Sequence, residues 1–347
     1  MSRRFSLANS FSTKANSAAL SERSLSVVLD ERVSMIFILD VANVNATAYE
    51  VNCKMESPVL KPIIHSFFDE PTHTVTYLVI DPETHKAAVI DPVFDYDHAS
   101  GKASMGSVEK VLAKAAAEGC KIELVLETHV HADHLSGAPY IKLKTGASVA
   151  IGERIREVQN IFRPIFNAQD VSGSGSEFDR LVKDGEHFII GKLDVEVIAT
   201  PGHTPACVSY KIGDAVFVGD TLFMPDYGTA RADFPGGDAG QLYRSIKRLL
   251  SLPSETRLFM CHDYLPKLGR KTHVWETTVA AERASNVHVH EGISEADYVT
   301  MRNARDKTLS APALLMPSIQ VNMRAGKLPP PDSNGVSYIR VPIKLVG

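Results

Sequence analysis

The chain has 347 residues, of which 44% are hydrophobic and 22% charged, so it is long enough for one large layered core or for two domains. Its formal charge is -4 at pH 7 and no basic stripe accumulates along it, which argues against a nucleic-acid partner and favours small ones. No apolar run approaches the ~18 residues that a membrane span needs, and no Cys-x-x-Cys pair occurs, so we expect a soluble protein with four free thiols, Cys53, Cys120, Cys207 and Cys261.

Residues 1–57 form an N-terminal extension in which we recognise no chemistry, and residues 58–347 form the predicted folded domain. The first 21 residues contain Arg3, Arg4 and Lys14, six serines and no acidic residue. That composition is typical of a mitochondrial transit peptide, but a disordered extension or a start codon placed upstream of a bacterial gene gives the same pattern. The predicted location is the mitochondrial matrix in the first case and the cytoplasm if the chain is bacterial.

The first half of the folded region combines short apolar strands with helices. Strands bounded by turn residues are predicted at 63–68, 75–80, 87–91 and 122–126. Helices are predicted at 107–118, 135–145 and 155–166. In the first helix Ser107 is the expected N-terminal cap and Gly119 the stop, and the second is expected to carry Asp133 and His134 at its N-terminus.

The second half repeats this order of strands followed by helices. Strands are predicted at 187–190, 193–199, 208–212, 215–219, 257–260 and 338–344. Helices are predicted at 238–250 and 275–286. Because strands precede helices twice over, we predict two sheets packed face to face with helices outside. The Ser/Gly segment 172–176 is interpreted as a surface loop, because it lacks the Lys-Ser/Thr of a phosphate-binding loop.

One short run contains four candidate metal ligands. His129, His131, Asp133 and His134 follow directly on the predicted strand at 122–126. Three imidazoles and a carboxylate on one loop would repel one another when protonated and lose solvation when buried, unless a cation collects their lone pairs. The run therefore predicts a metal site.

Three later segments also end an apolar strand with a ligand-competent residue. They carry His203 after Pro-Gly, Asp220 after Gly, and His262 after Cys261. Ligands at the ends of neighbouring strands converge on one edge of a sheet, so we expect all seven side chains to meet there. The pair His288 and His290 follows the end of a helix without a partner motif and is interpreted as solvated surface.

This order of His-x-His-x-Asp-His, Gly-His, Gly-Asp and a late His resembles the metallo-β-lactamase superfamily. The resemblance implies an α/β fold, a four-layer αββα sandwich, over about residues 60–347. It implies one metal on His129, His131 and His203 and a second on Asp133, His134 and His262, with Asp220 between them. Members of the superfamily mostly use zinc to activate a water molecule for hydrolysis, and Asp133 would orient that nucleophile.

The surrounding sequence resembles one branch of the superfamily, the persulfide dioxygenases (ethylmalonic encephalopathy protein), which oxidise glutathione persulfide to sulfite. The resemblance rests on the segment 219–234, on His262-Asp263-Tyr264 and on 322–326. It implies one Fe(II) on His129, His203 and Asp220, with the other four candidate ligands orienting these and holding water. Arg231 and Tyr264 would contact glutathione, Tyr264 next to the reacting atoms, and Arg324 of the late motif is a further candidate substrate residue.

The chain departs from that branch in two places. The loop between Asp220 and Arg231 is longer by about two residues, and Ala325 stands where the branch has Cys. The segments are also similar to a bacterial β-lactamase-like group named as hydrolases. A glutathione thioesterase of the glyoxalase II type, with one or two zinc ions, therefore stays open, although the region after Leu309 lacks a helical domain rich in Lys and Arg. Arg231 could instead pair with Asp233 or Asp238, and the sequence is compatible with a homodimer.

Overall fold

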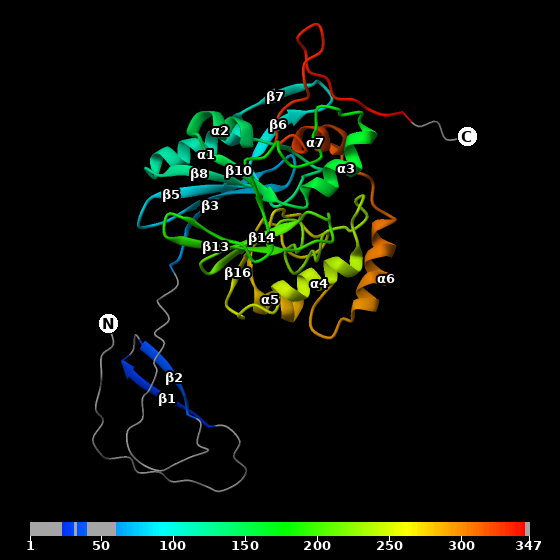
Figure 1. Cartoon of the computed structure of the whole chain (residues 1–347). Helices are drawn as coiled ribbons and strands as arrows, with labels where there is room; N and C mark the ends of the chain where they lie inside the picture. Colours follow the sequence, from blue (N-terminus) through cyan, green and yellow to red (C-terminus); the bar gives the residue numbers. More distant parts are fainter. Residues whose placement is uncertain (1–22, 31–32, 40–59, 344–347) are drawn as a thin grey trace, which may run out of the picture. The chain divides into compact units, whose positions relative to one another are not determined.

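The computed structural model describes residues 23–30, 33–39 and 60–343 and divides into two units, Met1–Pro58 and Val59–Gly347 (Figure 1). In the first unit, strand β1 (Arg23–Asp30) pairs antiparallel with strand β2 (Val33–Leu39), a hairpin that the sequence analysis does not predict. Residues 1–22, which carry the transit-peptide pattern, lie outside the described residues. None of the described helices is long and apolar enough to cross a membrane.

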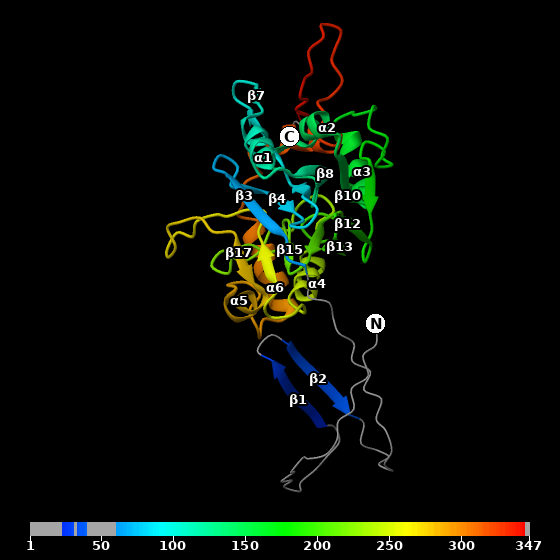
Figure 2. The same cartoon turned by 90° about the vertical axis from the view of Figure 1, so that its left-hand side faces the viewer.

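The second unit contains two six-stranded sheets that lie face to face (Figures 1 and 2). The first sheet has the spatial order β11 (Arg180–Val182), β10 (Ser148–Gly152), β8 (Lys121–Leu126), β5 (Lys86–Ile90), β4 (Thr74–Ile80) and β3 (Ile63–Asp69). The second runs in chain order through β12 (His187–Ile190), β13 (Leu193–Ala199), β14 (Val208–Ile212), β15 (Ala215–Phe217), β16 (Arg257–Phe259) and β17 (Glu276–Thr278). A small sheet joins β7 (Lys102–Ser104), β6 (Val93–Asp97) and β9 (Leu135–Ser136).

Helices cover the outer face of each sheet (Figure 1). On the side of the first sheet lie α1 (Gly106–Ala117), α2 (Ala138–Thr145), α3 (Ile155–Ile165) and α7 (Leu315–Asn322). On the side of the second lie α4 (Ala239–Leu249), α5 (Val279–Ser285) and α6 (Glu295–Asp306). One apolar core fills the space between the sheets, and a further core lies under each helical layer. The predicted αββα sandwich is therefore confirmed.

Two buried tyrosines tie the sheets together close to the ligand loops. The Tyr77 hydroxyl of the first sheet donates to the carbonyl of Met260, 2.5 Å away, just before Cys261 and His262. The Tyr210 hydroxyl of the second sheet donates to the carbonyl of Glu127, 3.0 Å away, at the start of the histidine-rich loop. Since a buried hydroxyl without a partner destabilises a fold, these bonds fix the two strand ends from which the ligands project.

Two helix starts in the first half differ from the prediction. The helix predicted at 135–145 begins only at Ala138, because Leu135–Ser136 pairs with β6 as strand β9 and Pro139 favours a first helical turn. Asp133 and His134 therefore precede a short strand and not a helix. Ser107 does not cap α1, which begins at Gly106, and its hydroxyl donates instead to Oδ1 of Asp69, 3.3 Å away.

The C-terminal third differs more. The helix predicted at 275–286 begins at Val279, because residues 276–278 pair with β16 as a strand. Helix α6 was not predicted, because its buried face consists of Tyr298, Arg302 and Asp306, and two charged residues hide the apolar periodicity. Helix α7 was also missed, and no strand forms at 338–343, the described part of the predicted final strand.

A buried carboxyl in α5 makes stability depend on pH. Burial raises the pKa of Glu282 to about 8, although Asn286 donates a hydrogen bond to it. Between pH 4.5 and 8 the unfolded chain therefore loses this proton before the folded chain does, and stability falls as pH rises through that window. We expect Glu282→Gln to be more stable than the wild type at pH 9, by a few kcal/mol (order of magnitude), and similar to it at pH 5. Urea unfolding at both pH values measures the difference in free energy of unfolding between the variant and the wild type, with exposed Glu255→Gln as the control. A difference of the same size at pH 5 and pH 9 would contradict the prediction.

Candidate metal centre

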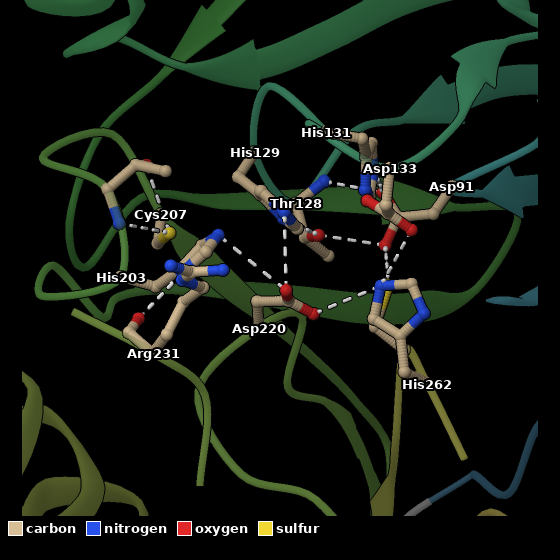
Figure 3. A network of polar contacts seen from close by, with 12 residues as sticks. Asp91, Thr128, His129, His131, Asp133, His203, Cys207, Asp220, Arg231 and His262 are labelled. Atoms are coloured by element: carbon tan, nitrogen blue, oxygen red, sulfur yellow. Dashed lines mark hydrogen bonds and ion pairs between the residues drawn. The ribbon is translucent and has the colours of Figure 1, made fainter. Parts of the chain in front are cut away.

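The predicted ligands meet at one edge of the sandwich, on loops that leave four strands (Figure 3). The histidine-rich loop follows β8, and the other loops follow β13, β15 and β16. Asp133 is half-buried and the other side chains are buried. The structure brings together every predicted ligand, namely His129, His131, Asp133, His134, His203, Asp220 and His262.

Asp220 lies between two groups of ligands. Its Oδ2 is 3.6 Å from Nε2 of His203 and 3.9 Å from Nε2 of His129, and its Oδ1 is 3.3 Å from Nε2 of His262. Oδ2 of Asp133 is 3.3 Å from the same His262 nitrogen. Ligand atoms lie within 4.8 Å of one another in the triad of His129, His203 and Asp220, and again in the group of His131, Asp133 and His134.

A buried carboxylate, Asp91, orients two of the histidines (Figure 3). Its Oδ2 accepts from the Thr128 hydroxyl, 2.8 Å away, whose oxygen accepts from Nδ1 of His129 at 2.9 Å. Its Oδ1 accepts from Nε2 of His131 at 3.0 Å. The lone pairs are therefore on Nε2 of His129 and Nδ1 of His131. Asp91 was not predicted as a residue of the site. Its signal in the sequence is an Asp-Pro pair that ends an apolar strand, and in the structure this aspartate has φ of 48°.

The other three rings are anchored through Nδ1. His203 donates to the carbonyl of Arg231, 2.8 Å away. His262 donates to the carbonyl of His73 at 3.3 Å, and Nδ1 of His134 lies 3.3 Å from the Thr74 hydroxyl. In each ring Nε2 is left to carry the lone pair. Nε2 of His203 and Nε2 of His262 face Asp220, and Nε2 of His134 is buried without a partner among the described residues.

This donor set fits a metal cation. Among the described residues, several buried ligand atoms lack a hydrogen-bond partner: Nε2 of His129, His134 and His262, Nδ1 of His131 and Oδ1 of Asp220. Lone pairs that face carboxylate oxygens at this range repel them unless a proton or a cation lies between, and nitrogen and carboxylate ligands suit zinc or iron.

The electrostatics favour the unprotonated form of three candidate ligands. Burial and the neighbouring imidazoles lower the pKa of His129 and His134. Burial works against ionisation of Asp133, but His262 and His134 hold the pKa of that carboxyl well below its usual value. At His131 burial is outweighed by Asp91 and Glu127, which raise the pKa of the ring. Metal binding requires the unprotonated forms, so a cation at His131 would displace a proton.

Comparison with known proteins identifies the family. Residues 69–262 match the family model described as the metallo-beta-lactamase superfamily. The chain belongs to this superfamily. The seven candidate ligands are those that the resemblance to the metallo-β-lactamase superfamily implies, and the structure places them on its αββα sandwich.

Relatives within the metallo-β-lactamase superfamily carry different names. A probable metallo-hydrolase of Burkholderia pseudomallei is 50% identical over 82% of this chain and 99% of its own, and Glyoxylase B2 of Dictyostelium discoideum is 46% identical over 82% and 97%. The mitochondrial persulfide dioxygenase ETHE1 of Mus musculus is 27% identical over 80% and 92%. The crystal structure of ETHE1 from Myxococcus xanthus matches with a TM-score of 0.60 and 31% identity over 76% of this chain and 99% of that one.

Two of the predicted substrate residues lie at this metallo-β-lactamase centre. The Tyr264 ring packs on the His262 ring, with centroids 5.6 Å apart, and on Phe223 and Tyr227. Burial, together with the carboxylates of Asp133 and Asp220, raises the pKa of Tyr264, so the phenol keeps its proton. The backbone carbonyl of Arg231 accepts the hydrogen bond that anchors His203. The guanidinium of Arg231 pairs with both carboxylate oxygens of Asp233, at 2.6 and 2.7 Å.

The late motif has a structural use. Asn322 donates to the carbonyls of His131 and His134, at 2.9 and 2.8 Å, and so fixes the histidine-rich loop from α7. Arg324 is buried and pairs with Asp170 at 2.7 and 2.8 Å, and it lines a surface cavity that includes none of the seven ligands. Ala325, with φ of 57°, packs in the core under the helices.

His288 was predicted to be solvated surface, but it is half-buried, and its Nδ1 accepts from the backbone N–H of Thr229 at 3.1 Å. Burial lowers the pKa of His288 to about 4, which keeps the ring neutral and able to accept this bond.

Proposed function

We propose that the chain is a non-haem iron oxidoreductase that oxidises a low-molecular-weight persulfide, in the first instance glutathione persulfide, with O2. The balanced reaction converts RSSH, O2 and H2O into RSH, sulfite and two protons. The S–S bond breaks, the terminal sulfur loses four electrons, and O2 accepts them. Such a reaction removes sulfide-derived sulfur from the cell and is a detoxification step.

The observation that carries this proposal is the triad of His129, His203 and Asp220. Their ligand atoms lie within 4.8 Å of one another, and both rings are anchored through Nδ1, so they present two nitrogens and one carboxylate to the same point. Two histidines and one carboxylate are the ligand set of Fe(II) oxygenases, and Fe(II) held there leaves open positions for O2 and a sulfur substrate. The 31% identity to the ETHE1 structure supports the same choice.

The neighbouring residues suit a persulfide attached to an anionic thiol. Phe223, Tyr227 and Tyr264 form an aromatic wall beside His262, and the protonated Tyr264 phenol can donate to sulfur. The planar guanidinium of Arg231 can donate two parallel hydrogen bonds to a carboxylate of glutathione, which would then replace Asp233 as its partner. Arg324 pairs with Asp170 and lines a cavity that includes none of the seven candidate ligands, so we give it no part in substrate binding.

A zinc-dependent glutathione thioesterase is the second candidate. The observation that favours it is the group of Asp133, His134 and His262, because the buried Nε2 atoms of both histidines lack a partner among the described residues and could bind a second metal. The names of the relatives, metallo-hydrolase and Glyoxylase B2, also support hydrolysis.

Metal analysis and oxygen uptake distinguish the two. Protein purified without oxygen should contain about one iron per chain, consume O2 when glutathione persulfide is added, and release sulfite. A glutathione thioester, added to the same preparation, serves as the control substrate and should not be cleaved. Two zinc ions per chain, thioester cleavage and no oxygen uptake would refute the dioxygenase.

A further inference from the structure

Thr74, the first residue of β4, contacts three of the ligands through one hydroxyl. The side chain is fully buried and lies beside His262, with which its backbone forms a β-bridge. Its Oγ1 is 3.3 Å from Nδ1 of His134, 3.4 Å from Nδ1 of His262 and 3.3 Å from Oδ2 of Asp133. It is also 2.9 Å from the hydroxyl of Thr72.

Two carboxylates, Asp69 and Asp133, set the direction of these hydrogen bonds. Asp69 can only accept, so the Thr72 hydroxyl donates to its Oδ2, 2.7 Å away. Asp133 can likewise only accept, so the Thr74 hydroxyl donates its one proton to Oδ2 of Asp133, 3.3 Å away. Because the one proton of Thr72 goes to Asp69, both lone pairs of Thr74 remain for the two histidines.

The consequence is a fixed tautomer for each ring. A lone pair of Thr74 can accept only if Nδ1 of His134 and Nδ1 of His262 carry protons, which leaves the lone pairs on the Nε2 atoms. The carbonyl of His73 demands the same tautomer of His262. Both Nε2 atoms are buried and lack a partner among the described residues, and that of His262 lies 3.3 Å from Oδ2 of Asp133 and 3.3 Å from Oδ1 of Asp220, where a cation would be held.

We infer that Thr74 is a positioning residue of the centre: through its hydroxyl, whose proton goes to Asp133, it holds His134 and His262 with Nε2 lone pairs toward a second cation position next to the triad. This inference rests on hydrogen bonding and holds whichever metal and reaction the triad supports. It assigns no contact between Thr74 and substrate.

The experiment is a titration of metal-depleted full-length protein with Co(II), followed by the visible absorption of the bound ion, without substrate or O2. The wild type should take up two equivalents. Thr74→Val keeps the shape but lacks the hydroxyl; it should bind the first equivalent as the wild type does and the second about 10–100-fold more weakly, with changed absorption bands. Thr74→Ser restores the hydroxyl and should bring the second affinity back to within about threefold of wild type.

Thr76→Val is the matched control, because Thr76 lies on the same strand and is equally buried, but its hydroxyl donates to the carbonyl of Asp91 and not to a histidine. It should bind the second Co(II) normally, and thermal melting should show all variants folded. Wild-type affinity in Thr74→Val, a loss in Thr74→Ser as large as in Thr74→Val, or a single equivalent in the wild type would each overturn the inference. None of these results concerns oxygen uptake, so they are distinct from a failure of the proposed function.

Discussion

Replacing Asp220 with Ala should leave the protein folded but lower its metal content and turnover by more than about 100-fold, beyond the range seen for residues that merely orient a ligand. The reason is its place in the centre: its two oxygens lie 3.3–3.9 Å from Nε2 of His129, His203 and His262, and these are the nearest negative charges that could balance a cation in the triad. Metal analysis and oxygen uptake measure the effect, with thermal melting to verify the fold. The exposed Asp194→Ala serves as a control and should change neither quantity.

His131→Ala is the comparison that separates one metal from two. In the single-iron centre His131 only supports the triad, so this variant should keep most of its iron, although the loss of its ring leaves Asp91 and Glu127 without their shared partner and lowers stability. In a two-metal hydrolase the ring is a ligand and activity would be abolished. Loss of metal as complete as in Asp220→Ala would make the single-iron assignment wrong.

The candidate ligands could be predicted because His and Asp residues are densely clustered in the sequence and directly follow apolar segments that read as strands. The run from His129 to His134, His203 after Pro-Gly and Asp220 after Gly each stand where an apolar segment ends, and the sandwich brings strand ends together. The two-sheet fold followed from the same apolar segments. These signals are local, so one sequence is sufficient to read them.

The residues that orient the ligands could not be predicted, because their roles depend on contacts between distant segments. Thr74 is one of two threonines in an ordinary apolar strand, and only the pairing of β4 with the segment at His262 shows its use. Asp91 stands in the sequence only as the last residue of the strand predicted at 87–91, which gives no sign that its carboxylate contacts the histidine-rich loop. Helix α6 was missed for a related reason: Arg302 and Asp306 are buried only because they pair with each other and with backbone at 229 and 232.

Gly202→Ala should unfold the protein more easily and displace His203, the next residue. Gly202 has φ of 145°, a conformation that other residues rarely adopt, and a Cβ placed there would lie 2.3 Å from the backbone of Leu242 in α4. Backbone cannot move aside as a flexible side chain can, so the turn or the helix must shift. We expect a destabilisation of about 3–5 kcal/mol, in the exceptional range for one substitution, together with a weaker metal site.

Gly185→Ala separates the clash from the backbone conformation. Gly185 also has a positive φ, 70°, but nothing lies within 4 Å of the place of its Cβ, so this variant should lose only about 1–2 kcal/mol. Urea unfolding of both metal-depleted variants gives the two free energies, and Co(II) titration reports the triad. Since the Gly202 carbonyl accepts from the N–H of Asp238, 2.8 Å away, at the N-terminus of α4, the damage should reach that helix as well. Equal losses in the two variants, with Co(II) affinity unchanged, would show that the close packing of this turn on α4 is not what places His203.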